Sequence, residues 1–195
     1  MNETIAVFAA VSAILGAAHA VGDHWIQHQA DSDAKGLPGW IGRLACVKHV
    51  ATYTATAVIG LGLAHLYLDL STEPVPTAIG LGVSAVSHYI ADRREPLRRI
   101  ANALGKQDFY RLKSFGMNGA YLLDQSWHAG YLVWAALIIA GGTDRLALTA
   151  LLAVTVTAFL GYKVARAEQR SGRLAEQVAP VSPAVATPVR QEVEV

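Results

Sequence analysis

Three pairs of a histidine and an aspartate, each pair four residues apart, interrupt a chain that is otherwise mostly apolar. The pairs are His19 and Asp23, His88 and Asp92, and Asp124 and His128. Residues four apart lie on one face of an α-helix, so each pair directs an imidazole and a carboxylate the same way. Each pair also lies at one end of an apolar stretch, and ionisable groups at membrane depth are costly and usually functional. The spacing therefore predicts a polar site built by several helices.

These residues, together with His49, form a ligand set for a divalent metal ion. Imidazole nitrogens and carboxylate oxygens suit Zn, Mn, Fe or Ni, and helix bundles hold such ions between inward-facing side chains. We expect one or two ions, with the metal ligands His19, Asp23, His88, Asp92, Asp124 and His128. His49 is either a further ligand or the catalytic general base. We expect Gln27, Lys48 and Gln125 to support the metal ligands through hydrogen bonds.

A metal with an open coordination position lowers the pKa of its bound water, which favours hydrolysis of a phosphoester or an acyl lipid. Two other interpretations remain open. Histidine–aspartate hydrogen bonds can fix the packing of transmembrane helices without any metal. Chains of such residues also serve as proton or ion relays, although His65 and Asp69 are the only candidates for an exit from the opposite side. A scaffold is therefore the main alternative, and a relay is the weaker one.

The composition indicates an integral membrane protein. Of 195 residues, 53% are hydrophobic and 16% are charged, against a charged share of about 25% in typical soluble domains. Charge is nearly absent from residues 4–18, 50–68, 75–90, 125–143 and 146–162. A membrane-spanning helix needs about 20 mostly apolar residues, so we expect spans at residues 4–27, 46–68, 75–92, 121–142 and 145–163. The predicted fold is an all-α bundle of about five transmembrane helices with a His/Asp layer near the cytoplasmic face.

The basic residues predict the orientation of these spans. All but one of the 16 Lys and Arg residues lie between the first and second apolar stretches, between the third and fourth, or after the fifth; the exception is Arg145. Because short loops rich in Lys and Arg stay in the cytoplasm, we expect the N-terminus outside and the C-terminus inside, in a bacterial inner membrane. The first stretch carries Glu3 and no basic residue, so it is expected to be a retained helix rather than a signal peptide. All four ends that bear His or Asp then meet at the cytoplasmic face.

Two segments lie outside the expected spans. The loop at residues 93–118 contains a short basic amphipathic helix, which suits contact with anionic lipid headgroups. The arginines expected to contact lipid are Arg93, Arg94, Arg98 and Arg99. The transmembrane domain is expected to cover residues 1–168. Residues 169–195 are rich in Pro, Val, Ala and Glu without a usable period, so a disordered cytoplasmic tail is expected.

Other sites are not indicated by the sequence. A single cysteine, Cys46, excludes an intramolecular disulfide. The chain has no Gly-rich phosphate loop, no Gly-x-Ser-x-Gly motif and no zinc-finger spacing. Because membrane topology already explains the basic loops, no nucleic-acid partner is expected. Membrane lipids are the expected partners.

The motifs also resemble a family. The run from His19 through Asp23 to Gln27, then His49, and the later His/Asp pairs resemble an uncharacterised family of small bacterial and phage integral-membrane proteins with a His-x3-Asp-x3-Gln signature. The resemblance covers roughly residues 12–140 and implies the membrane fold without an activity. The pattern of His and Asp in membrane helices is also similar to that of membrane-bound metal-dependent hydrolases. The leading hypothesis is a membrane-embedded metal-binding protein, and specifically a hydrolase of a phospholipid or lipid-linked substrate at the cytoplasmic face; the alternative is a non-enzymatic scaffold.

Overall fold

The computed structural model describes residues 3–114 and 116–178, and almost all of them are helical. In chain order the elements are α1 (Glu3–Val21), the π-helical turn η1 (Gly22–Ile26), α2 (Gln29–Ala34), α3 (Gly39–Leu68), α4 (Pro74–Asp92), α5 (Glu95–Ala103), α6 (Gln107–Arg111), β1 (Lys113–Ser114), β2 (Met117–Asn118) and α7 (Gly119–Val178). The two short strands form an antiparallel hairpin. The all-helical class predicted from the sequence is confirmed.

Three helical segments are long and apolar enough to cross a membrane, at Glu3–Ile26, Gly39–Leu68 and Gly119–Arg173. The helix α4 falls short of this standard because it carries Ser84, Ser87, His88 and Asp92. These four polar residues are buried against other helices. Large apolar side chains such as Leu66, Leu151 and Val154 are more than half exposed, as expected for surfaces that face lipid.

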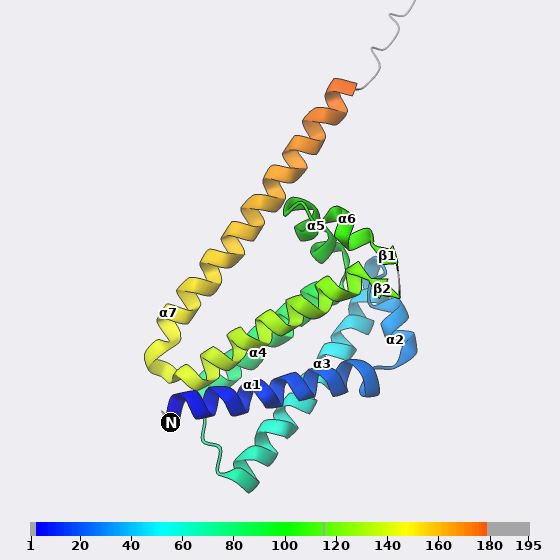
Figure 1. Cartoon of the computed structure of the whole chain (residues 1–195). Coiled ribbons are helices and arrows are strands. Elements are labelled where there is room, and N and C mark those ends of the chain that lie inside the picture. Colours follow the sequence, from blue (N-terminus) through cyan, green and yellow to red (C-terminus); the bar gives the residue numbers. More distant parts are fainter. Residues whose placement is uncertain (1–2, 115, 179–195) are drawn as a thin grey trace, which may run out of the picture.

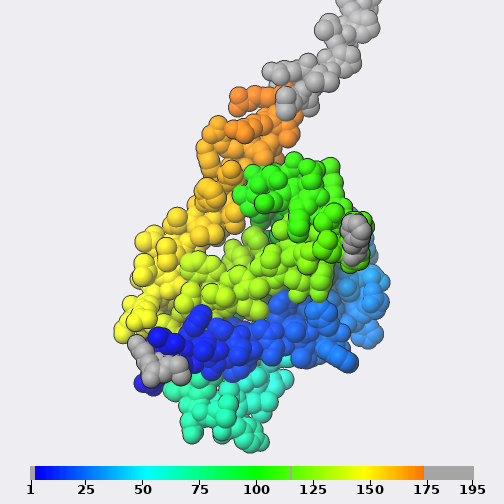
Figure 2. Space-filling view, in the orientation of Figure 1, coloured from blue at the N-terminus to red at the C-terminus, as the bar shows by residue number. Residues whose placement is uncertain are grey.

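The long helix α7 consists of two arms that meet at Gly142, where the backbone leaves the helical region (φ 65°, ψ −170°). Glycine adopts this positive φ readily because it has no Cβ. The first arm (residues 119–141) returns along α4, and the second arm (residues 143–178) runs back beside it and projects past the rest of the molecule (Figures 1 and 2). The Glu73 carboxylate accepts hydrogen bonds from the backbone N–H and the hydroxyl of Thr143, which ties the α3–α4 turn to this bend.

Two predicted boundaries were wrong. The second predicted span starts at residue 46, but α3 begins at Gly39, directly after the extended residue Pro38. The predicted tail starts at residue 169, but the second arm of α7 stays helical to Val178. Its sequence after Tyr162 is rich in Ala, Arg, Glu and Gln, which are strong helix formers. Residues 179–195 of the predicted tail lie outside the described residues.

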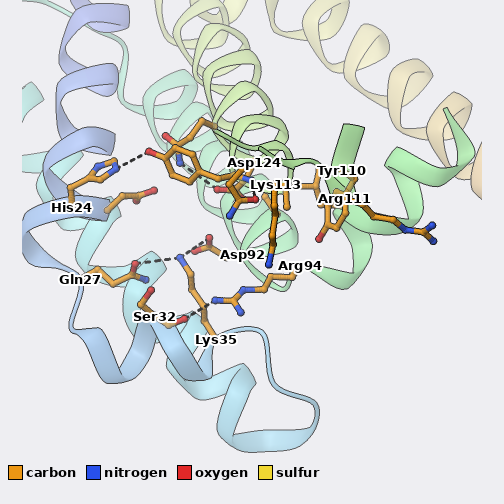
Figure 3. A pocket seen from close by; sticks show the side chains of 17 residues that line it. His24, Gln27, Ser32, Lys35, Asp92, Arg94, Tyr110, Arg111, Lys113 and Asp124 are labelled. Atoms are coloured by element: carbon orange, nitrogen blue, oxygen red, sulfur yellow. Dashed lines mark hydrogen bonds and ion pairs between the residues drawn. The ribbon is translucent and has the colours of Figure 1, made fainter. Parts of the chain in front are cut away.

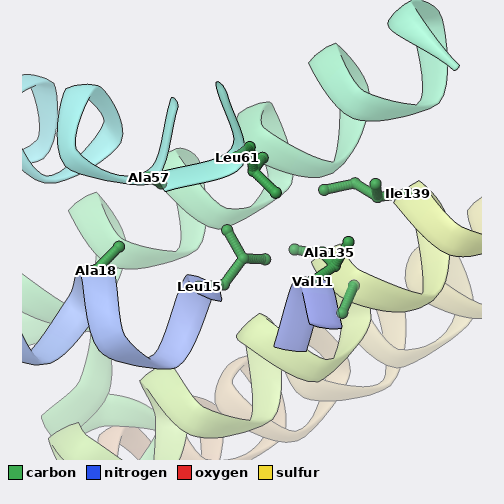
Figure 4. Packing of buried hydrophobic residues seen from close by; sticks show 8 residues of the cluster. Val11, Leu15, Ala18, Ala57, Leu61, Ala135 and Ile139 are labelled. Atoms are coloured by element: carbon green, nitrogen blue, oxygen red, sulfur yellow. The ribbon is translucent and has the colours of Figure 1, made fainter. Parts of the chain in front are cut away.

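Small residues allow the main helices to pack closely. Val11, Leu15 and Ala18 of α1 pack with Ala57 and Leu61 of α3 and with Ala135, Ala136 and Ile139 of α7 (Figure 4). Where α4 crosses α7, a Cβ at Gly80 would lie 2.6 Å from Ile139 Cγ1 and 2.8 Å from the Ala135 carbonyl oxygen. Close approach through small residues is the usual way in which membrane helices associate. This packing holds one end of four helices together: the end of α1 with η1, the start of α3, the end of α4 and the start of α7, here called the polar end (Figure 1).

Candidate metal centre

Four buried side chains from three helical segments meet at the polar end. Nε2 of His49 lies 2.9 Å from Nε2 of His88. Each of these nitrogens also lies 3.2–3.5 Å from Oδ1 of Asp23 and from Oδ2 of Asp92. These four atoms are here called the central set. Their side chains are at most 8% exposed.

The two carboxylate oxygens of the central set are short of hydrogen bonds. Asp23 Oδ1 and Asp92 Oδ2 are buried and have no hydrogen-bond partner among the described residues. Their contacts with the imidazole nitrogens are close enough for charge pairing but are not aligned as hydrogen bonds. A buried carboxylate oxygen without a partner costs about 1–3 kcal/mol or more. A cation between the four atoms would remove that cost.

The spacing within the central set matches the spacing of ligands around one ion. At metal–ligand bonds of about 2.0–2.1 Å, two ligand atoms lie about 3.0 Å apart at right angles and about 3.4 Å apart at tetrahedral angles. The five separations that involve an imidazole nitrogen of the central set run from 2.9 to 3.5 Å. This spacing fits a divalent cation.

The end of α1 positions Asp23 through a π-helical turn. Nδ1 of His19 lies 3.2 Å from Oδ2 of Asp23, so the predicted pair does face one way. The turn η1 begins at Gly22, and a Cβ at Gly22 would lie 3.3 Å from Cα and Cβ of Tyr53. Glycine here lets α1 approach α3 closely. Single π-helical turns occur frequently at functional sites.

The remaining predicted residues adjoin the central set. His128 donates from Nδ1 to the backbone oxygen of Asp124 at 2.8 Å, and its buried Nε2 has no hydrogen-bond partner among the described residues. The ring of His128 lies 4.2 Å from that of His88 and 4.6 Å from that of His19. Three overlapping groups have ligand atoms within 4.8 Å of one another: His19, Asp23 and His88; His49, His88 and Asp92; and Asp92, Asp124 and His128. All seven predicted residues thus come together, and their role as ligands stays a prediction.

The sequence analysis missed Tyr53, which supports His88. The Tyr53 ring stacks on the His88 ring with 4.4 Å between centroids, and its hydroxyl shares a 2.5 Å hydrogen bond with Ser84. Tyr53 is almost fully buried. The spacing rule could have found it, because Tyr53 follows His49 by four residues on α3.

The sequence analysis also missed Lys35. Lys35 Nζ lies 2.8 Å from Asp92 Oδ1 and donates to Gln27 Oε1 at 3.3 Å. It thereby pairs with the oxygen of Asp92 that is not in the central set. No local spacing signals this contact, since the two residues are far apart in the chain and their segments meet only in the fold.

Arginines hold the segment that carries Lys35, residues 28–38, here called the α2 strap. Arg93 donates to the backbone oxygens of Lys35 at 2.6 Å and Leu37 at 2.7 Å, and Arg94 donates to that of Ser32 at 2.9 Å. The guanidiniums of Arg93 and Arg94 thus bind carbonyls of the α2 strap, and contact of these two arginines with lipid stays a prediction. Arg98 and Arg99 are exposed and pair with Glu95, so lipid contact stays a prediction for them.

The three expected supporting residues behave differently. Gln27 accepts from Lys35, and Gln125 donates to Asp124 Oδ2 at 3.3 Å. Lys48 is exposed and makes no contact with the central set in the part of the chain that is described. Adjacent residues on a helix point about 100° apart, so the burial of His49 turns Lys48 outward. The prediction for Lys48 was wrong.

A cleft of about 730 Å³ opens beside Asp23, Asp92 and Asp124 (Figure 3). Its lining includes the carboxylates of Asp23, Asp92 and Asp124 and the cationic side chains of Lys35, Arg94, Arg111 and Lys113. Tyr110 and Tyr121 also line it, and the Tyr121 hydroxyl bonds His24 Nε2 at 3.1 Å. Burial raises the pKa of the Tyr110 hydroxyl above its ordinary value, so this group is a neutral donor at physiological pH. The cleft therefore connects the carboxylates of the candidate site to cationic walls.

No family model matches the chain, and comparison with curated proteins and with solved structures gives no match. The resemblance to the His-x3-Asp-x3-Gln family and the likeness to membrane metal-dependent hydrolases stay predictions. The candidate site therefore rests on its own geometry.

Proposed function

We propose that this protein binds a divalent metal ion at the polar end of a membrane-embedded helical bundle and uses it to hydrolyse a phosphoester of a lipid or lipid-linked substrate. The observation that carries the proposal is the central set, in which two buried carboxylate oxygens without hydrogen bonds face two imidazole nitrogens at ligand spacing. Such a donor set accepts Zn, Mn, Fe or Ni.

Charge balance supports one ion rather than two. The site holds three carboxylates, those of Asp23, Asp92 and Asp124, and one ammonium, that of Lys35. One divalent cation would bring their sum to zero with neutral imidazoles. A buried site is stable only when its charges are compensated in this way.

The geometry favours a division of roles among the residues. His49 belongs to the central set, which favours a ligand over a general base. Asp124 is not within the central set and lines the cleft, so it is placed to accept a proton from a water molecule there. A bound metal would supply a water of lowered pKa and polarise the substrate.

The proposed topology has five crossings: α1, α3, α4 and the two arms of α7. It is supported by the three apolar spans, by the bend at Gly142 within the longest of them, and by the partition of the basic residues. With the N-terminus outside, the polar end and its cleft lie at the cytoplasmic face of a bacterial inner membrane. A lipid headgroup on that face would be within reach.

The alternative is a scaffold in which hydrogen bonds fix the helices. The short His49–His88 contact favours it, because one ring can donate to the other without an ion. The two proposals differ at Asp92. The Asp92→Asn variant keeps the size and hydrogen-bonding capacity of the side chain but removes the charge that a cation requires.

The test is the metal content of purified protein. We expect the dialysed protein to retain close to one equivalent of metal, Asp92→Asn to lose it, and Asp108→Asn to keep it, because Asp108 is exposed and outside the site. Added metal should raise the unfolding temperature in detergent for the unmodified protein and for Asp108→Asn, but not for Asp92→Asn. Absence of both retention and stabilisation with Zn, Mn, Fe and Ni would refute metal binding and leave the scaffold.

A further inference from the structure

We propose that the cleft above the central set is a binding site for a phosphate monoester group, held by Lys113 and Arg94. The inference rests on the proposed function for its location, because the bound group would lie over the metal-binding residues. It adds residues that neither the motif spacing nor the ligand geometry assigns. Lys113 comes from the β hairpin and Arg94 from the junction between α4 and α5.

Lys113 is a cation without a counter-ion. Its side chain is exposed, lines the cleft and has no hydrogen bond or ion pair among the described residues. Figure 3 shows it extending from the hairpin toward the side chain of Arg94. By contrast, the neighbouring lysine of the cleft, Lys35, is already paired with Asp92 at 2.8 Å. An unpaired ammonium group close to buried carboxylates can bind an anion that enters the cleft from solvent.

Arg94 is held in position by the backbone and by the α2 strap. Its φ of 60° is in the left-handed region, which is strained for a residue other than glycine. One terminal nitrogen donates to Ser32 at 2.9 Å, and the other guanidinium N–H groups have no partner among the described residues. The side chain lies across Gly36, where a Cβ would approach Arg94 Cδ to 2.7 Å. Strain and packing together fix a guanidinium that keeps free donors at the cleft.

The charge and the donors fit a phosphate group. With one divalent cation and Lys35 balancing the three carboxylates, the charges of Arg94, Arg111 and Lys113 remain for the ligand. Neutral donors in the same lining are the hydroxyl of Tyr110 and the amide of Asn118. Arginine and lysine with neutral donors are a common combination for phosphate oxygens. A phosphate monoester dianion offers more oxygens and more charge than a carboxylate would.

The experiment measures binding without turnover. The protein in phosphatidylcholine nanodiscs is titrated in two arms, one with inorganic phosphate and one with short-chain phosphatidic acid. Lys113→Gln should weaken binding in both arms by about tenfold or more, the effect of losing a charge-assisted hydrogen bond. The matched control is Lys106→Gln, since Lys106 is an exposed lysine of the same loop that does not line this cleft. Unfolding temperatures of both variants are expected to equal that of the unmodified protein.

The outcomes separate the ligand sources and the two proposals. Tighter binding of phosphatidic acid than of inorganic phosphate would assign the site to a lipid headgroup, and equal binding would assign it to free phosphate. No binding in either arm, or an equal loss in Lys106→Gln, would overturn the anion site. Metal content is measured on each sample. Metal without phosphate binding refutes the anion site alone, and Lys113-dependent phosphate binding without metal refutes the proposed function alone.

Discussion

At the scale of single residues, the buried carboxylates depend on compensating charge. The side chain of Asp92 is 2% exposed, and its two oxygens have separate environments. Oδ1 pairs with Lys35 at 2.8 Å, whereas Oδ2 faces the imidazoles of His49 and His88. A buried carboxylate with only one compensated oxygen is costly. The ammonium and the proposed cation therefore act on the same residue from opposite sides.

This dependence predicts the effect of replacing Lys35 by methionine, which keeps most of the length of the side chain. Lys35→Met should destabilise the metal-free protein by about 1–3 kcal/mol, the cost of leaving a buried polar group unpaired. The loss should be smaller in metal-loaded protein, because the cation still balances Asp92. Thermal unfolding in detergent with and without metal measures both values. An equal loss in the two states would show that Lys35 and the metal site are independent.

The overlap of the three ligand groups predicts different effects for His88 and Asp124. His88 is shared by two groups and belongs to the central set, so His88→Gln should abolish metal retention. Asp124 lies outside the central set, so Asp124→Asn should keep close to one equivalent of metal. Metal analysis after dialysis measures both. A complete loss of metal in Asp124→Asn would instead assign the ion to the group of Asp92, Asp124 and His128.

The sequence predicted the contacts that follow from helical spacing and missed those that depend on tertiary structure. The pair of His19 and Asp23 faces one way because four residues separate them. Lys35 meets Asp92 only because the α2 strap folds back over the end of α4. The hydrogen bonds of Arg93 were missed for the same reason, since the carbonyls that it binds belong to the strap.

At the scale of elements, close helix packing sets the positions of the ligands. The α4 helix carries His88 and Asp92 and packs on the first arm of α7, which carries Asp124 and His128. Gly80 lies at this crossing, where a Cβ would meet Ile139 and the Ala135 carbonyl at less than 3 Å. The contact is made about two turns from His88 and His128, so it fixes how far apart the two helices lie at the site.

The crossing predicts opposite effects for two glycines of α4. Gly80→Ala should be destabilising by about 1–3 kcal/mol, because added core volume forces the helices apart. A methyl group added at Gly82 would have no neighbouring atom within 4 Å, so Gly82→Ala should be neutral or slightly stabilising through helix propensity. Thermal unfolding in detergent measures the stability of both variants against the unmodified protein. A Gly80→Ala protein that melts at or above the unmodified protein would contradict the tight crossing.

Helix existence was easier to predict from the sequence than helix ends. Apolar stretches marked α1, α3, α4 and both arms of α7, because lipid and the interior both select apolar side chains. The start of α3 at Gly39 lies in a mixed sequence that precedes the apolar stretch of residues 50–68. There hydropathy carries no signal, and local propensity together with Pro38 decides the boundary.

At the scale of the whole molecule, the number of membrane crossings decides whether the α3–α4 turn and the loop before α7 lie on the same side of the membrane. Length and apolar composition alone identify three spans. If only those three cross, α4 does not, and the α3–α4 turn lies on the same side as the loop before α7. If α4 crosses and α7 crosses twice through the bend at Gly142, the turn and the loop lie on opposite sides. The positive-inside partition of the basic residues favours the second arrangement.

Cysteine labelling distinguishes these arrangements. Cys46 is the only cysteine and is buried, so a Cys46→Ala background can carry Thr72→Cys in the turn or Lys106→Cys in the loop. With five crossings, a membrane-impermeant maleimide should label position 72 in intact cells and position 106 only after permeabilisation. Labelling of both positions under the same condition would show that α4 does not cross the membrane. Asp92 would then not have to lie at the cytoplasmic face, and a cytoplasmic lipid phosphoester would lose its support as the substrate. The proposal that the central set binds a metal would be unaffected.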